Sequence, residues 1–462
     1  MRKKGSRWLN IETTNQATIP ICGRRSTLAH PIIYWAIALV PITQAVVILW
    51  LIWTRSSALP FWDEWFTVDL VRLMDECTLS WRELWAFHNE HRIVVPRIVN
   101  LLVIQATGWN RQVEMTINLI ISGSTLGLLL SSLRRSCRPI VPVWIAIAPF
   151  SLLVLSHGQY ENWLEPFQIA FIATAFGIAL CVRGFVTNTD AGWYGFALGG
   201  AILASLSSLG GLAVWPAFLP AACAMGRRKA IVWCMVALMI ILPYIHDMPT
   251  QGTVSGPGQA RIAYTLVYLG MPVAYPFTDL ARLMSTIGIV VLACALIVHS
   301  VTGGERRILL IWAGLIAHGA GCALMTSLGR DIRTEFVPSR YQIFAAEWWL
   351  GILAIAGLAI IQWRQSKRSN CTAHRMIVAL VASMGCIVLL LCSGGLLQAN
   401  RSGLQSALQF QKSQRASQEC MRDPLRATEA CLRVYYPGQD WENEHVPERA
   451  DYLRHTDRAL YR

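Results

Sequence analysis

The sequence is poor in charged residues. Only 15% of its 462 residues are Asp, Glu, Lys or Arg, against about 25% in an average soluble domain. Hydrophobic residues make up 54% of the chain, which excludes an intrinsically disordered protein, because disorder requires a low apolar content. The same excess argues against a soluble globule and makes membrane insertion the first question.

The sequence also lacks the spacings that mark common metal and nucleotide sites. Its 13 cysteines include no Cys-x-x-Cys pair and no Cys/His metal spacing, so they do not indicate a zinc site or a disulfide framework. Eleven of them lie in or beside apolar runs and are expected to be small buried hydrophobic residues. No Gly-rich phosphate loop follows a strand pattern, which disfavours a nucleotide-sugar substrate.

Long uncharged runs are abundant instead. Residues 32–53 contain no charged residue and are long enough to cross a bilayer, which takes roughly 20 helical residues. No small-x-small cleavage site ends this run, so we predict a signal anchor. Ten further apolar runs predict an all-α polytopic membrane protein with about 11 transmembrane helices. They lie at 112–133, 139–156, 167–182, 193–209, 212–225, 230–246, 283–300, 308–327, 343–361 and 376–397.

The orientation follows from the distribution of basic residues. If the N-terminus is cytoplasmic, the inner segments carry 19 Lys and Arg residues against 3 Asp and Glu residues, and the remainder carries 21 against 24. Cytoplasmic loops are enriched in Lys and Arg, so we predict the N-terminus inside and the C-terminus outside. The net charge of +13 is therefore a topology signal, and no nucleic-acid partner is expected.

Three parts result from this topology. Residues 1–31 form a cytoplasmic N-terminal tail, and 32–397 form a transmembrane domain whose outer loop 54–111 holds the catalytic candidates. Residues 398–462 form a soluble outer-face C-terminal domain. The compact chain and short loops indicate a bacterial inner membrane with the catalytic face toward the periplasm.

Two outer segments are predicted to contain interfacial helices. In the first, Ser80 to Glu83 form a capping box, and Trp81, Leu84, Trp85 and His88 have the spacing of an apolar helical stripe with tryptophan anchors. In the second, the apolar stretch 262–277 is interrupted by two prolines, and counting it as a span would break the charge parity. We place it as an outer-face interfacial helix.

Two segments leave alternatives or need a specific fold. The stretch 193–225 is broken by glycines and prolines, so that two spans or a re-entrant hairpin both suit it. In the C-terminal domain, Asp423-Pro424 is typical of a helix start and lets the chain fold back. We therefore predict a disulfide between Cys420 and Cys431.

Polar residues concentrate in four groups, each located where a predicted span meets the outer surface. The bundle is expected to bring them into one cavity. The groups are Asp63 with Glu64, the run His88-Asn89-Glu90-His91-Arg92, the loop from His157 through Glu161 to Glu165, and Arg330, Arg333, Arg340 and Tyr341.

Asp63 and Glu64 follow the first span and are framed by two tryptophans. A carboxylate beside apolar surface has a raised pKa and serves as a base toward a hydroxyl or amine. Alternatively, Asp63 is the N-cap of a helix over 64–76. We predict Asp63 as the first catalytic candidate and Glu64 as the second.

The remaining groups are candidates for substrate contact. His88, Glu90 and His91 have the side chains that bind a divalent metal ion, although their spacing matches no established zinc signature. The alternatives are that these residues form local hydrogen bonds, or that together with Arg92 they contact the substrate. His157 and Glu161 indicate a sugar or cation contact.

The arginines suggest a phosphate site. Arg330, Arg333 and Arg340 suit a lipid phosphate, which guanidinium groups bind bidentately, and Tyr341 follows directly. The alternative is snorkelling to headgroups combined with local ion pairs.

An acidic pair in the first outer loop, interfacial helices in that loop, about eleven spans and a soluble outer C-terminal piece resemble the GT-C superfamily of membrane glycosyltransferases. Pro60 to Trp65 and, more loosely, Arg340-Tyr341 carry the resemblance. It implies a polyprenyl-phosphate-linked sugar donor, membrane lipids as surroundings, and Asp63 as the base that activates a cell-envelope acceptor. The chain departs from better-studied members because it has no Asp-x-Asp.

Two other classes remain open. A transporter or flippase of a lipid-linked or anionic solute predicts charged residues near mid-span and an internal repeat, and no convincing repeat is found. An outer-face transferase of acyl or phospho groups is the third possibility.

Overall fold

The computed structural model describes residues 31–137, 144–249, 257–330, 337–366, 372–420 and 440–459. Within these ranges the regular elements are all helices, which confirms the predicted all-α class. Seven of the described helices are long and apolar enough to cross a membrane. The chain is therefore a multi-pass membrane protein. These segments are Trp35–Arg55, Arg111–Cys137, Pro166–Thr187, Arg227–Ile245, Thr278–Thr302, Arg306–Gly329 and Ser339–Trp363.

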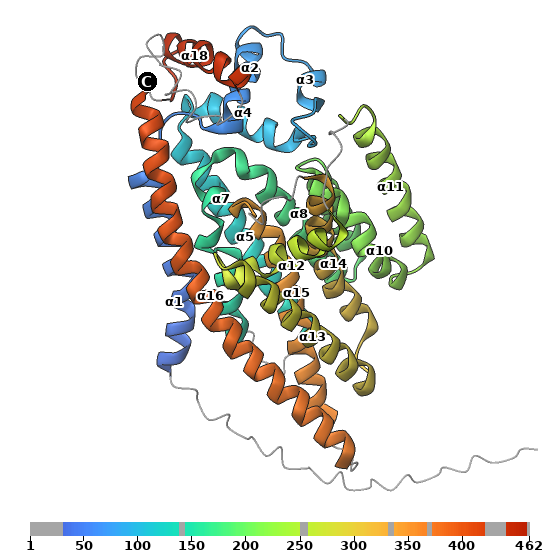
Figure 1. The fold of residues 1–462 in the computed structure, drawn as a ribbon. Coiled ribbons are helices and arrows are strands. Elements are labelled where there is room, and N and C mark those ends of the chain that lie inside the picture. The colour runs from blue at the N-terminus through green and yellow to red at the C-terminus, as the bar shows by residue number, and fades with distance from the viewer. Residues whose placement is uncertain are drawn as a thin grey trace, which may run out of the picture.

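The helices form one bundle in which α8 and α15 are central (Figure 1). In α8 and α15, 83% of the most apolar window is buried, against 22% in α1 and 17% in α11, so the latter two present most of their surface outward. The long helices are α1 (Pro31–Arg55), α5 (Arg111–Cys137), α8 (Ile169–Thr187), α11 (Arg227–Ile245), α13 (Thr278–Thr302), α14 (Arg306–Gly329) and α15 (Gln342–Ser366). α6 (Trp144–Val154) is shorter.

The stretch 193–225 forms a helical hairpin. The π-helix η5 (Gly192–Leu198) continues into α9 (Gly199–Ser205), and η6 (Leu209–Ala213) continues into α10 (Val214–Ala224). Both arms are shorter than the roughly 20 residues of a full span. The first arm packs closely on α8 because Gly177 and Gly200 face each other: a Cβ on Gly177 would lie 2.5 Å from the Gly200 carbonyl oxygen.

The stretch 262–277, predicted as an interfacial helix, forms most of a helix that packs into the bundle. α12 (Gly258–Ala274) packs against α13, α14, α15 and α16, and its residues from Val267 to Ala274 are buried. Pro272 is accommodated inside α12, and Pro276 lies in the turn to α13.

The segment 54–111, predicted as the first outer segment and given that name below, contains the short helices that were predicted. They are η1 (Trp62–Trp65), α2 (Phe66–Asp75), α3 (Trp81–Trp85) and α4 (Val94–Thr107). The Ser80 capping box is confirmed: Ser80 Oγ accepts the Arg82 N–H at 3.2 Å, and the Glu83 carboxylate accepts the Ser80 N–H at 3.0 Å. The predicted stripe is wrong at its end, because α3 stops at Trp85 and His88 leaves the helix.

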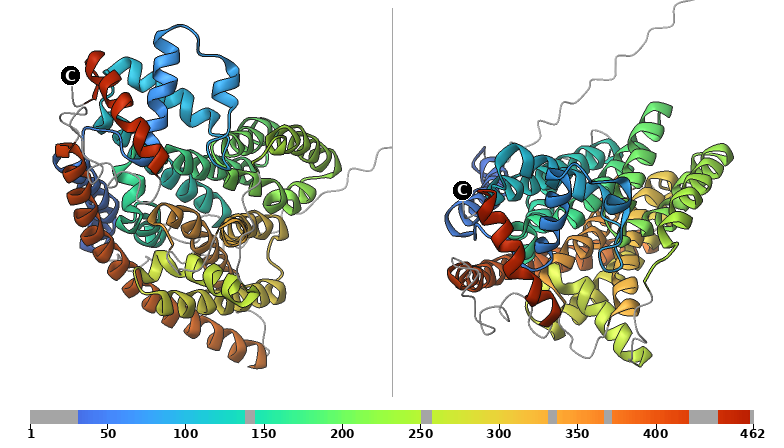
Figure 2. Two further views of the ribbon diagram at one scale, coloured as in Figure 1. Left: turned by 45° about the horizontal axis from the view of Figure 1, so that its top comes forward. Right: turned by 90° about the horizontal axis from the view of Figure 1, so that it is seen from above.

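The C-terminal part begins without a break from the last long helix. α16 (Thr372–Cys420) is continuous through residue 397, where a domain boundary was predicted. α18 (Asp440–His455) then packs on α2, where Arg449 pairs with Asp69 at 2.6 Å. Figure 2 shows α18 and the short helices of the first segment capping the same end of the bundle. The predicted Cys420–Cys431 disulfide lies outside the residues whose side chains are described.

Candidate functional site

Asp63 lies in η1, directly after Trp62, whose φ of +49° is uncommon for a residue with a side chain. Its Oδ2 atom is 3.6 Å from His88 Nε2, and its side chain is 41% exposed. The helix α2 begins only at Phe66, and its N-cap is Trp65, so Asp63 does not act as the N-cap. Asp63 is therefore available to a ligand.

The charge state of Asp63 is set by opposing effects. Partial burial raises the pKa of its carboxyl group, but the nearby His88 side chain and the positive charge of Arg340 outweigh this effect and lower the pKa overall. Asp63 is therefore a carboxylate at neutral pH, as a proton acceptor must be.

A tight turn places the next group. His88 and His91 exchange backbone hydrogen bonds of 2.8 and 2.9 Å, and Asn89 occupies the left-handed region at φ +52°, which asparagine tolerates better than most residues. His88 faces Asp63 from this turn and packs on Phe167, with 4.8 Å between ring centroids. Glu90 and His91 line a cavity instead.

The tautomer of His91 follows from its partners. Its Nδ1 atom accepts the Leu209 backbone N–H at 3.2 Å, so the hydrogen of the neutral ring is on Nε2, which is 3.5 Å from Glu90 Oε1. Burial lowers the pKa of His91 to about 4. The ring is therefore neutral at physiological pH and directs an N–H toward the Glu90 carboxylate.

Arg330 and Tyr341 approach Glu90 from the opposite wall. Arg330 Nη2 is 3.6 Å from Glu90 Oε1, and the Arg330 guanidinium carbon is 5.1 Å from the Tyr341 ring centroid. The Arg330 side chain is 39% exposed. One guanidinium thus remains accessible at the polar end of the cavity.

Arg340 is held more rigidly. Its Nη1 atom donates to Glu161 Oε1 at 2.8 Å, and its backbone N–H donates to Glu161 Oε2 at 2.9 Å. Ser339 Oγ donates to the same oxygen at 2.7 Å. The guanidinium carbon also lies 5.9 Å from the Trp62 ring centroid, which connects Arg340 to the segment that carries Asp63.

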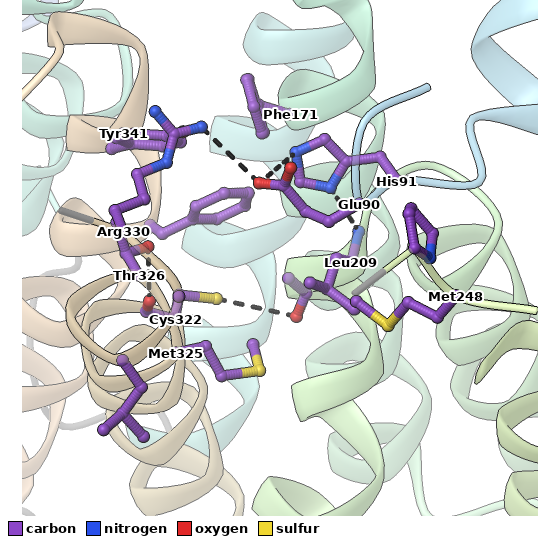
Figure 3. A pocket seen from close by; sticks show the side chains of 15 residues that line it. Glu90, His91, Phe171, Leu209, Met248, Cys322, Met325, Thr326, Arg330 and Tyr341 are labelled. Atoms are coloured by element: carbon purple, nitrogen blue, oxygen red, sulfur yellow. Dashed lines mark hydrogen bonds and ion pairs between the residues drawn. The ribbon is translucent and has the colours of Figure 1, made fainter. Parts of the chain in front are cut away.

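The cavity between these groups has a volume of about 330 Å³. Glu90, His91, Arg330 and Tyr341 lie toward one end of it, while Cys322 and Met325 lie toward the other (Figure 3). Apolar side chains form much of the wall: Phe171, Leu209, Met248, Met325, Leu328 and Phe344. No sequence motif marked these residues, because each lies in or just beyond an ordinary apolar run. A polar end and an apolar body suit an amphiphilic ligand.

Asp63 and Arg340 are adjacent to this cavity without lining it. Asp63 contacts His88, which shares a turn with His91, and Arg340 packs 5.4 Å from the Tyr341 ring centroid. The four polar groups predicted from the sequence therefore lie together, because each contacts a member of another group. These contacts are Asp63 with His88, Glu90 with Arg330, and Arg340 with Glu161.

Several candidate residues have structural partners instead. Glu64 is buried and binds Arg111 through both carboxylate oxygens, at 2.7–3.1 Å, so it is not a second base. Arg92 donates to the backbone oxygens of Trp85, Tyr244 and His246. It fixes the first outer segment to the end of α11.

His157 and the metal candidates do not form a site. His157 lies in η3 (His157–Gln159), where its backbone N–H donates to Asn400 of α16, and burial lowers the pKa of its ring to about 4. In the part of the chain that the structure describes, no three His, Cys, Asp or Glu residues are arranged to hold a metal ion, so His88, Glu90 and His91 are not assembled as ligands. Arg333 lies outside the described residues.

Glu165 is a further member of the cluster, which the sequence placed in the third polar group without a role. It follows α7 (Tyr160–Leu164) and accepts a hydrogen bond from Gln168 in η4 (Pro166–Gln168). Burial, reinforced by the charge of Glu161, raises its pKa to about 8. Asp63 and Glu165 thus have pKa values displaced in opposite directions, a pattern typical of acid and base partners.

The raised pKa of Glu165 predicts a pH-dependent stability. Protonation stabilises the folded protein fully below the ordinary pKa of 4.5, and this contribution is lost as the pH rises through about 8. Glu165→Gln mimics the protonated acid, so its thermal stability in lipid nanodiscs should decline less than that of the wild type between pH 5 and pH 8.5. Equal declines would contradict the prediction; exposed Glu76→Gln is the matched control.

Comparison with protein-family models, curated proteins and solved structures finds no match to this chain.

Proposed function

We propose that the protein is a membrane glycosyltransferase of the GT-C type, which moves a sugar from a polyprenyl-phosphate donor to an outer-face acceptor such as a cell-envelope glycan, lipid or protein. The observation that carries this proposal is the location of a half-exposed carboxylate, Asp63, in one polar cluster with Arg330 and Arg340, beside a largely apolar cavity. A lipid-linked donor has the matching parts: an apolar chain, an anionic phosphate and a reactive sugar.

The residues divide the reaction between them. Asp63 accepts the proton of the acceptor hydroxyl, whose oxygen forms a bond to the anomeric carbon of the sugar. The bond between that carbon and the phosphate oxygen breaks, and the electron pair leaves with the lipid phosphate. Arg330 and Arg340 stabilise the negative charge that this phosphate gains.

The proposal includes the finer topology. Besides the seven long apolar helices, α6, both arms of the 192–224 hairpin and the apolar part of α16 are taken as crossings, which gives eleven. The N-terminus is then cytoplasmic, and α18 lies with the first outer segment on the periplasmic side of a bacterial inner membrane. The common location of α2 and α18 at one end of the bundle supports this arrangement (Figure 1).

The first test is product formation. The purified protein is reconstituted into vesicles with a radiolabelled polyprenyl-phosphate sugar and envelope extract. Glycosylated product is expected, and it should be absent from vesicles without protein. Donor consumption with no new glycoconjugate would contradict the proposal.

Arg340 should affect the leaving group. Arg340→Gln removes a charged donor and is expected to lower kcat by about 10²–10³-fold, the usual cost of losing such a donor. Arg340→Lys keeps the positive charge but not the bidentate guanidinium group, so its kcat should lie between those of the wild type and Arg340→Gln. Steady-state kinetics with the exposed Arg82→Gln as control measures this; an unchanged kcat in Arg340→Gln would remove Arg340 from the reaction.

A second candidate function is transport of a lipid-linked or anionic solute. The observation that favours it is an ion pair between His318 and Glu347 inside α14 and α15, since ionisable residues within spans often mark transport pathways. Movement of labelled lipid across the vesicle membrane without chemical change would favour this function over glycosyl transfer.

A further inference from the structure

His318 and Glu347 form a pair within the bundle. His318 lies near the middle of α14, and Glu347 lies in the first half of α15. Their side chains are 0% and 5% exposed, and His318 Nδ1 is hydrogen-bonded to Glu347 Oε2. The sequence signals for this pair were a histidine inside the apolar run 308–327 and a glutamate inside the run 343–361, and neither indicates that the two side chains are paired.

The hydrogen bonds of His318 fix how many protons the pair holds. His318 Nε2 is 3.1 Å from the carbonyl oxygen of Gly210, and a carbonyl only accepts, so Nε2 carries a hydrogen. One further proton is then shared between Nδ1 and the Glu347 carboxylate. The pair has no net charge whether that proton resides on the imidazole or on the carboxyl group.

The pair is connected to the cavity described above. Gly210 and Cys322 both line that cavity. Cys322 Sγ is 3.8 Å from His318 Nε2 and 3.6 Å from the Gly210 carbonyl oxygen. The Cys322 thiol and the Gly210 carbonyl thus contact the imidazole and line the cavity.

The opposite side of the pair also has space and polar atoms. Glu347 lines a second cavity of about 20 Å³ together with Ser122 and Thr125 of α5, which is enough for a single water molecule. Among the described residues no group donates a hydrogen bond to Glu347 Oε1. This oxygen is therefore the atom at which the pair can accept an additional proton.

Few other ionisable groups interact electrostatically with the His318–Glu347 pair. In the described part of the chain these are the thiols of Cys322, on α14, and Cys181, on α8, while Tyr268 of α12 acts on Cys322. No acidic or basic side chain of the described residues of α5, α10, α12 or α13 is among the groups that act on it. The charge of the pair is thus controlled by its own protons.

We propose that His318 and Glu347 form a proton-binding site inside the membrane, which takes up a proton at Glu347 from the side of the second cavity, while Cys322 and Gly210 lie between its imidazole and the first cavity. The ligand is the proton itself, accepted at Glu347 Oε1. This site does not depend on glycosyl transfer, and its test needs no sugar substrate.

Cys322 is a natural reporter, because a positive charge on the pair stabilises its thiolate. The full-length protein in lipid nanodiscs is alkylated with N-ethylmaleimide from pH 5 to pH 9, and labelling of Cys322 is followed by peptide mass spectrometry, with exposed Cys77 as the internal reference. In the wild type, the labelling rate at Cys322 should show an acid-side shoulder that the reference profile of Cys77 lacks.

Glu347→Gln separates the proton site from a merely structural pair. Glutamine can donate to Nδ1 and leave the Gly210 hydrogen bond intact, so the fold should be kept while the shoulder disappears or moves to lower pH by about one unit or more. A single titration curve in the wild type, a shoulder unchanged in Glu347→Gln, or no labelling of Cys322 at all would each overturn the proposal. The wild-type profile decides by itself if the variant fails to accumulate.

Discussion

Asp63→Asn is expected to reduce the rate of glycosyl transfer by about 10²–10⁴-fold, the usual contribution of a positioned general base. Asparagine has the same shape and can still contact His88, which is 3.6 Å away in the wild type, but it cannot take a proton from the acceptor. The loss should therefore appear in kcat, with little change in the KM for the lipid donor. Rates are measured in nanodiscs with saturating donor and acceptor.

The pH profile gives this prediction a second readout. Neighbouring positive groups lower the pKa of Asp63 despite its burial, so wild-type activity should persist below pH 5 and decrease only as the carboxylate is protonated. Glu76→Gln removes an exposed carboxylate from the same outer segment and should leave both rate and profile unchanged. Wild-type rates in Asp63→Asn would remove this residue from the mechanism.

Local patterns in the sequence predicted the helices and the meeting of the polar groups. The uncharged run 32–53 became α1 (Pro31–Arg55), with its ends displaced by only one or two residues, because apolar length is a property of the segment itself. The polar groups converge for a related reason: each adjoins the end of a helix, and these ends lie at the same end of the bundle. The position of Asp63, Glu90 and Arg340 at helix ends was therefore sufficient to predict that they lie in one region.

Pairings between distant residues were not predictable in this way. Glu64 looked like a second base, yet its partner Arg111 lies 47 positions away. Arg92 looked like a ligand contact, yet it binds backbone carbonyls near the end of α11. In each case the sequence correctly indicated a charged side chain near an apolar surface. It does not indicate whether a ligand or another part of the chain pairs with that charge.

The Glu64–Arg111 pair makes the largest stability prediction. Both side chains are buried, at 3% and 0% exposure, and removing one partner of such a pair typically costs about 3–5 kcal/mol because the other charge is left unpaired. Arg111→Gln should therefore lower the free energy of unfolding by about this amount, measured by denaturant titration in mixed micelles. Arg82→Gln, an exposed arginine of the same outer segment, is the control and should change little.

The two single variants should not be equivalent, because a second acidic side chain is close by. Glu114, one turn into α5, interacts electrostatically with both Glu64 and Arg111. Glu64→Gln leaves Arg111 with the Ser57 carbonyl and the nearby Glu114, whereas Arg111→Gln leaves the Glu64 charge beside a second acidic side chain and without a cation. The expected order of stability is wild type, then Glu64→Gln, then Arg111→Gln.

Glu114 also provides the decisive control for this order. At alkaline pH, where Glu114 ionises and repels Glu64, adding Glu114→Gln to Arg111→Gln should make the double variant more stable than Arg111→Gln alone. The same Glu114→Gln change in the wild-type background lacks this benefit, because there Arg111 already balances the site. If Glu114→Gln had the same effect in both backgrounds, the three residues would not form one electrostatic unit, and Arg111 would act only through its packing and its bond to Ser57.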